Sequence, residues 1–129
     1  AACLLRRMSL TMAGVDEPAA KYTVEDLKVD LYRNALPQHA SFKSSATLYD
    51  YGYMGARHLQ QLADLAIIDG AALKPIAFQL AEALGISIDD TITRLRALLM
   101  MHSEEWAAFK QLQGNGSFLQ LWTKGGRHG

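Results

Sequence analysis

The sequence predicts a mainly helical domain with a helix-turn-helix-like core and a small β-hairpin or strand at its C-terminal end. Apolar residues recur at three- and four-residue spacing through most of the 129 residues. Residues 75–98 have the pattern of two helices joined by a sharp turn. Near the C-terminus, a Gly-Asn-Gly turn separates two short segments, which is a hairpin signal. At this length the chain is expected to form one domain with its own core, organised as residues 1–22, 23–113 and 114–129.

The first helix of the central pair is predicted to run from Pro75 to Leu84. Its apolar residues, Ile76, Leu80, Ala83 and Leu84, recur at helical spacing and therefore form one stripe. Pro75 suits the first turn of a helix, where its missing N–H group has no partner to lose.

The turn and the second helix are marked by Gly85 and Ser87. Glycine can take the left-handed conformation that ends a helix, because it has no side chain to clash. Ser87 is expected to cap the next helix, with Asp90 in the capping position three residues later. The buried stripe of that helix is expected to comprise Ile88, Ile92, Leu95, Leu98 and Leu99.

This stretch resembles the helix-turn-helix of small DNA-binding regulators, in which an alanine, a turn glycine and an aliphatic residue hold two helices together. Ala81, Gly85 and Ile92 stand in those roles, although Ile92 follows Gly85 by seven residues where six is usual. Asp89 and Asp90 open the helix that would enter a groove, and carboxylates there repel phosphates. The alternative is an ordinary helical hairpin packed in a core.

The C-terminal segment extends the resemblance to the winged-helix family. Residues 109–113 and 117–122 are predicted to be the two strands of the wing, the alternative being that 103–113 is all helix and 117–122 one lone strand. The resemblance implies a non-enzymatic DNA-binding protein, either a regulator or a component of a nucleoprotein assembly. Thr91 and Thr93 would lie near bases. Phosphate contacts would come from Arg94, Arg96, Lys110, Lys124 and Arg127, the last two on a flexible tail.

A second hypothesis is a helical adaptor or assembly subunit. The formal net charge is zero, which weighs against strong attraction to nucleic acid unless a local basic patch exists. In this interpretation an exposed apolar surface that includes Trp106, Phe118 and Trp122 docks on a protein partner or a second copy of the chain.

The N-terminal half is expected to contain three helices and one extended segment. The helices are predicted near the N-terminus within 1–15, over 23–35 and over 55–68. Tyr49, Tyr51 and Tyr53 alternate with other residues, which predicts a short strand. The three phenols would be either a platform on which bases stack or a group packed under a helix with wet hydroxyls.

Metal ions, cofactors and catalysis are not expected. Asp69-Gly70 and Gly85 have the glycine spacing of paired EF-hands. At the start of the calcium loop that Gly70 would define, Asp69 offers the only side-chain oxygen, so calcium binding is excluded. A calcium-free EF-like helix pair stays as a minor fold alternative. The single cysteine, Cys3, rules out an internal disulfide and a cysteine-based zinc cluster. The four histidines show no ligand spacing, and the phosphate-loop, nucleophile-elbow and zinc-protease motifs are missing.

The expected location is the cytoplasm. The first 15 residues lack acids and contain Arg6 and Arg7, so their composition also resembles the tail of an organelle presequence; the alternative is therefore an organelle matrix. No apolar run approaches the length of a membrane span, and membrane contact is not expected.

Overall fold

The computed structural model describes residues 2–39, 43 and 45–127, and within these ranges the chain is helical and contains no strand. The α-helices are α1 (Ala2–Met12), α2 (Ala46–Asp64), α3 (Lys74–Leu84), α4 (Ile88–Gln113) and α5 (Phe118–Thr123). Short 3-10 helices lie between them: η1 (Ala19–Lys21), η2 (Tyr32–Ala35), η3 (Leu65–Ile67) and η4 (Gly70–Leu73). The prediction of a mainly helical fold is confirmed.

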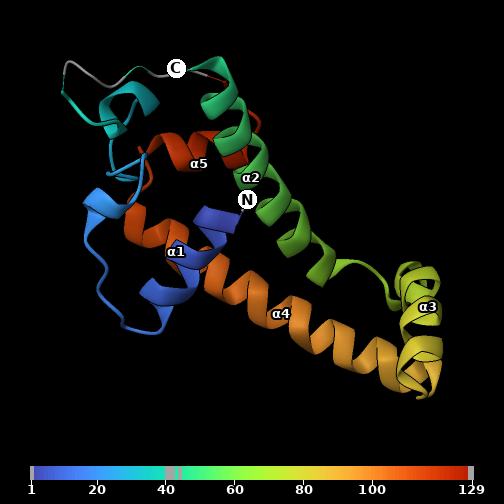
Figure 1. The fold of residues 1–129 in the computed structure, drawn as a ribbon. Coiled ribbons are helices and arrows are strands. Elements are labelled where there is room, and N and C mark those ends of the chain that lie inside the picture. The colour runs from blue at the N-terminus through green and yellow to red at the C-terminus, as the bar shows by residue number, and fades with distance from the viewer. Residues whose placement is uncertain (1, 40–42, 44, 128–129) are drawn as a thin grey trace.

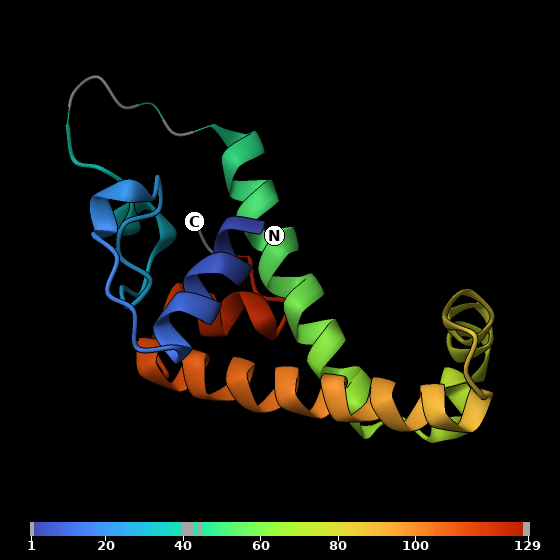
Figure 2. The same ribbon diagram turned by 60° about the horizontal axis from the view of Figure 1, so that its bottom comes forward.

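Helix α4 spans 26 residues and connects two unequal parts of the molecule. Its C-terminal half packs with α1, α2 and α5, whereas α3 packs on its N-terminal half (Figure 1). In both ribbon views α3 lies at the far end of α4, away from α1 and α5 (Figure 2). We call residues 65–101 the arm and the remaining described residues the body.

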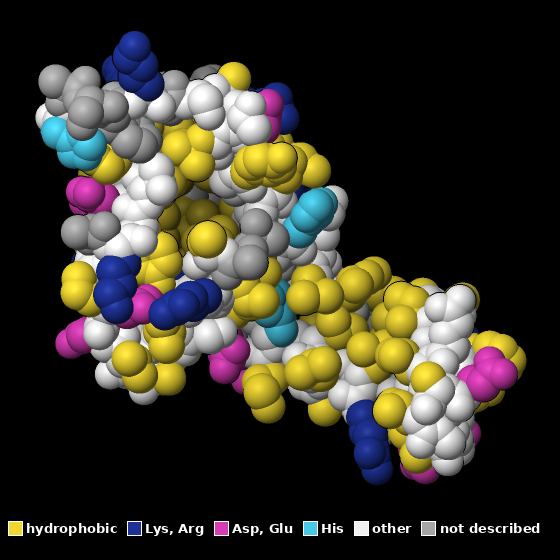
Figure 3. Space-filling model, in the orientation of Figure 1, with side chains coloured by type: hydrophobic (Ala, Val, Ile, Leu, Met, Phe, Trp, Pro, Cys, Tyr) yellow, Lys and Arg dark blue, Asp and Glu magenta, His cyan; other side chains and the backbone are white. Residues whose placement is uncertain are grey.

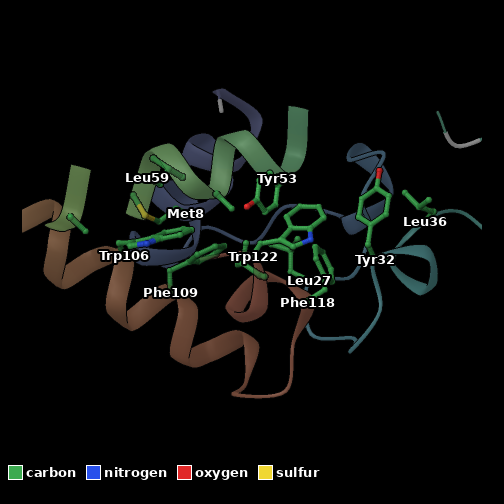
Figure 4. Packing of buried hydrophobic residues seen from close by; sticks show 14 residues of the cluster. Met8, Leu27, Tyr32, Leu36, Tyr53, Leu59, Trp106, Phe109, Phe118 and Trp122 are labelled. Atoms are coloured by element: carbon green, nitrogen blue, oxygen red, sulfur yellow. The ribbon is translucent and has the colours of Figure 1, made fainter. Parts of the chain in front are cut away.

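The core of the body is rich in aromatic side chains. Trp122 of α5 is 2% exposed and lies 4.8 Å from Phe118 and 6.0 Å from Tyr53, measured between ring centroids (Figure 4). Trp106 and Phe109 of α4 stack at 6.0 Å and are each 1% exposed. Burial of such a side chain contributes about 1.5–3 kcal/mol, so these rings dominate the packing of the body.

The predicted signals at the central turn are confirmed. Gly85 has φ of +67° and follows the last residue of α3, and its N–H donates to the carbonyl of Ala81. Ser87 Oγ accepts a hydrogen bond of 3.0 Å from the backbone N–H of Asp90 at the start of α4. These two residues therefore end one helix and begin the next, as helix-capping chemistry requires. Helix α4 then continues without a break through His102 to Gln113.

The predicted C-terminal hairpin is wrong. Residues 109–113 belong to α4, which ends at Gly114 with φ of +88°, and the second predicted strand is helix α5. Ser117 caps α5 by accepting from the N–H of Gln120. Phe118, its neighbour Leu119 and Trp122 are all buried, so the buried positions follow the helical period rather than the alternation of a strand. There is no wing in the described residues.

The helix predicted over 23–35 is also wrong, apart from its last turn in η2. The N–H groups of Glu25 and Asp26 donate to the carbonyl of Ala35, at 2.7 and 3.4 Å, so this segment folds back on itself. The Asp26 carboxylate accepts from the N–H of Lys28, two residues on. Its side chain therefore stabilises a local turn, which competes with the helix predicted over 23–35.

The strand predicted around the tyrosines is wrong as well. Helix α2 begins at Ala46, earlier than the predicted start at residue 55, and it ends at Asp64 before η3. Tyr49 and Tyr53 are four residues apart on this helix and both pack against Trp122. Tyr51 points elsewhere and is 71% exposed. The three phenols therefore do not form a common stacking platform.

Candidate interaction surface

Helix α3 contacts α4 through small side chains. Ala77 and Ala81 are 0% and 5% exposed, and Thr91 of α4 is buried with its hydroxyl donating to the carbonyl of Ser87 at 2.8 Å. Small residues let two helices approach closely without large apolar side chains between them. Beyond this contact, the arm has only a small cluster of buried side chains, formed by Ala66, Leu73 and Leu99.

Because its small residues face α4, helix α3 turns its large residues to solvent. Ile76, Leu80 and Leu84 repeat every four residues, and their exposed fractions are 48%, 39% and 63%. Phe78 is 58% exposed. Residues four apart lie on one helix face, so the first three form a continuous apolar stripe. It belongs to the apolar face that the sequence predicts for this helix, and no described residue covers it.

The same surface continues onto η3 and α4. Sixteen large hydrophobic side chains are exposed among the described residues, and ten of them lie between residues 67 and 101. Those outside α3 are Ile67, Ile68, Ile88, Leu98, Met100 and Met101. Figure 3 shows the yellow surface running along α4 towards the far end of the arm. Exposed apolar residues scattered singly are ordinary, but a concentration on one projecting element indicates an interaction site.

A groove lies at the tip of the arm, between the N-terminal ends of α3 and α4. It has a volume of about 570 Å³ and is open to solvent. Its walls are formed by Lys74, Pro75, Phe78, Ser87, Ile88 and Asp89. The groove thus has an apolar centre with one cation and one carboxylate at its rim.

The arm carries nearly balanced charge. Within residues 65–101 there are three basic residues and four acidic ones, so the formal net charge is 3 − 4 = −1. The acids include Asp89 and Asp90 in the first turn of α4, where they favour the positive end of the helix dipole. This balance fits an apolar protein contact better than a phosphate backbone, which requires a cationic face.

The predicted base-contacting and phosphate-contacting residues of α4 have different surroundings. Thr91 is 3% exposed, so its predicted place near a base is wrong. Thr93 is exposed, but its hydroxyl donates to the carbonyl of Asp89 at 3.0 Å. Arg94 and Arg96 are exposed as predicted, with Arg96 lying beside the backbone of η4.

The other predicted phosphate contacts lie on the body. Lys110 Nζ donates to Gln60 Oε1 at 2.6 Å, and burial lowers the pKa of this amine. Arg127 lies over the Tyr53 ring at 4.5 Å and is 3.7 Å from the Asp50 carboxylate. Lys124 is exposed just after α5. Figure 1 places α5 far from the start of α4, so the structure does not bring the predicted set onto one face.

The three residues predicted to dock on a partner in the adaptor hypothesis are buried, so this prediction is wrong. Trp106, Phe118 and Trp122 are 1%, 1% and 2% exposed, and Trp106 Nε1 donates to Gln60 Oε1 at 3.0 Å. They form the body core because their rings fill the space between α2, α4 and α5. Ten of the sixteen exposed large hydrophobic residues lie instead on the arm. Helix α3 carries a signal for these exposed residues in its sequence, namely a second stripe made of the small residues Ala77 and Ala81. This stripe competes with the stripe of large residues for the contact with α4.

The described residues contain no group of three or more His, Cys, Asp or Glu side chains that could hold a metal ion. His102 Nε2 is 3.0 Å from the carbonyl oxygen of Leu59.

In the described part of the chain, no helix is by itself long and apolar enough to cross a membrane. Residues 70–84 and 88–113 pass that test only as a pair bent by 110°. Comparison with protein-family models, curated proteins and solved structures finds no match to the chain.

Proposed function

We propose that the protein is a non-enzymatic adaptor or assembly subunit that docks on a protein partner through the apolar surface of the arm. The observation that carries the proposal is the orientation of α3. Its alanines face α4, whereas its large residues Ile76, Leu80 and Leu84 face solvent. An isolated hairpin would gain stability by burying the large residues. A partner that covers them restores that gain.

The proposed partner presents an amphipathic helix. An apolar helix laid into a groove uses anchors at three- and four-residue spacing, and the stripe on α3 has this spacing. Phe78 is two residues from both Ile76 and Leu80, so it points to a different side of α3, where it would offer the partner a second, aromatic contact at the groove of the tip. Asp89 and Asp90 beside the groove favour a partner helix with basic residues next to its apolar stripe.

Binding requires several of these residues to be covered together. Full burial of one such side chain contributes roughly 1.5–3 kcal/mol, and the arm residues are already partly buried, so each contributes less. Association costs an estimated 4–15 kcal/mol in lost translational and rotational freedom. One or two contacts are therefore insufficient, whereas the ten exposed residues between 67 and 101 are enough to offset the cost.

The test is site-specific photo-crosslinking in the native host, with the reactive residue at position 78 or at position 112. Phe78 and Leu112 have nearly equal exposure, 58% and 57%, but Leu112 lies on the body. We expect a discrete adduct from position 78 and none of the same mass from position 112. Equal crosslinking at both positions, or no discrete adduct, would contradict the proposal. An adduct containing only this chain would identify a homo-oligomer instead of an adaptor.

The crosslinked protein is then purified and its binding measured with variants of this chain. The change Phe78→Ser with Leu98→Ser should weaken binding at least tenfold, because hot-spot truncations commonly cost about 2 kcal/mol or more. Leu112→Ser is the matched control and should leave the affinity unchanged. Both arm residues are exposed, so the variants should keep the melting temperature of the parent.

A second candidate function, DNA binding, is favoured by one observation. The axes of 70–84 and 88–113 bend by 110° across the turn at Gly85, within the roughly 90–120° typical of a helix-turn-helix. Arg94 is exposed on the second helix, whereas Asp89 and Asp90 oppose phosphate binding. A duplex-binding titration at several salt concentrations tests it. Absence of binding even at low salt excludes this candidate.

A further inference from the structure

A separate cavity of about 440 Å³ lies in the body, between α1, α2, α5 and the segment 21–27. Its floor is formed by Phe118, Leu119 and Trp122 of α5, and its apolar walls include Leu4 and Leu48. A hollow with apolar walls is visible on the face of the body shown in Figure 3. The volume falls within the roughly 300–1,000 Å³ of small-molecule sites, and an apolar lining with few polar groups is their usual composition.

The charged groups on the lining are all cationic. Arg7 and Lys21 line the cavity, and its lining includes no Asp or Glu. The Lys21 amine is 3.6 Å from the Glu17 carboxylate and its side chain is largely exposed. Arg7, in contrast, is half-buried, and no carboxylate lies within ion-pair distance of it among the described residues. The cavity therefore combines an apolar interior with two cations, of which Arg7 has no carboxylate within ion-pair distance among the described residues.

The Arg7 side chain is held in place, but some of its hydrogen-bond donors have no partner in the described residues. Its Nη1 and Nη2 donate to the carbonyls of Val24 and Glu25, at 2.7 and 2.6 Å, and its guanidinium lies over the Tyr22 ring at 4.9 Å. A guanidinium has five N–H donors, so about three remain for a ligand. Burial lowers the pKa of Arg7, but an arginine stays charged at neutral pH. A fixed cation with free donors suits the planar oxygens of a carboxylate.

An apolar chain fits the floor and walls of this cavity, and an acidic head group fits the two cations of its lining. We propose that this cavity binds a single-chain alkyl carboxylate of the fatty-acid class, with its chain over the floor formed by α5 and its carboxylate beside Arg7 and Lys21. The site is independent of the arm.

Calorimetric titration with decanoate, below the concentration at which it forms micelles, tests the proposal. We expect saturable binding of one decanoate per chain and at least tenfold weaker binding of decanol, which has the same chain but no charge. Arg7→Gln should weaken decanoate binding about tenfold, the effect of losing roughly one charge-assisted hydrogen bond. Lys21→Gln should weaken it about threefold, because this side chain is more exposed, and Lys28→Gln, outside the lining, should have no effect.

Two further variants distinguish the cavity from adsorption on the arm. Leu48→Trp fills the cavity and should abolish binding, whereas Phe78→Ser changes only the arm and should leave binding unchanged. If Arg7→Gln fails to fold, Lys21→Gln and Leu48→Trp decide the question alone. No saturable binding of decanoate, equal binding of decanol, or sensitivity to Phe78→Ser but not to Leu48→Trp would overturn the proposal.

Discussion

The left-handed conformation of Gly85 allows the cost of a substitution there to be worked out from the structure. Its φ is +67°, and a Cβ added at this position would meet no atom within 4 Å. No clash contributes, so the whole cost is conformational, roughly 1–2 kcal/mol for an ordinary residue in this region. Gly85→Val should therefore lower the free energy of unfolding by more than ~1 kcal/mol, because its branched side chain is also the least tolerant of positive φ. Gly85→Asn should cost less than valine, since asparagine tolerates this conformation.

Urea denaturation followed by circular dichroism measures these changes, with Gly116→Ala as the control. A Cβ added at Gly116 would also lie in open space, but the φ of this residue is not positive, so alanine should be tolerated there. For a chain of this length, a loss of about 1 kcal/mol corresponds to a fall of roughly 3–6 °C in melting temperature. If Gly85→Val melts like the parent, or if asparagine costs as much as valine, the turn does not depend on the left-handed glycine.

Three further predictions concern single contacts. Ser87→Ala removes the N-cap of α4 and should cost about 0.5–2 kcal/mol, seen as a lower urea midpoint. If DNA binds, Arg94→Gln with Arg96→Gln should flatten the slope of log affinity against log salt by up to about two, since each phosphate contact contributes about 0.9; an unchanged slope would exclude these arginines as contacts. The hydrogen bond from Tyr22, followed by the contacts of Arg6, lowers the pKa of Glu17 in the folded state. This carboxylate therefore adds stability above its unfolded pKa that is lost as the pH falls through its folded pKa, so Glu17→Gln should destabilise at pH 7 but not at strongly acid pH.

The parts of the fold that depend on neighbouring residues can be predicted from the sequence. Gly85 and Ser87 act through the backbone within a few residues of themselves, and the turn that they define lies where the sequence predicts it. The N-terminal helix is predictable for the same reason, with Met8 on its buried side. Local capping and periodicity determine such features before any tertiary contact forms.

The parts that depend on distant contacts cannot be predicted in this way. Phe118 and Trp122 fit a strand or a helix by composition, and the packing of Trp122 against Tyr49 and Tyr53 of α2 and against Phe118 selects the helix. Because those rings close the body core, Trp122 cannot serve as a docking residue. A periodic pattern identifies which side chains share a face but does not state which protein or element covers that face.

Helix α3 contains two stripes that compete for one contact. The large residues are Ile76, Leu80 and Leu84, and the small ones are Ala77 and Ala81. Only one stripe can meet α4, and the structure puts the small one there. The large stripe retains the spacing of a buried face while lying exposed, so nothing in the described part of the chain covers it. If the large stripe was selected for burial, a second molecule must bury it. The partner is therefore expected to bind the arm rather than the aromatic body.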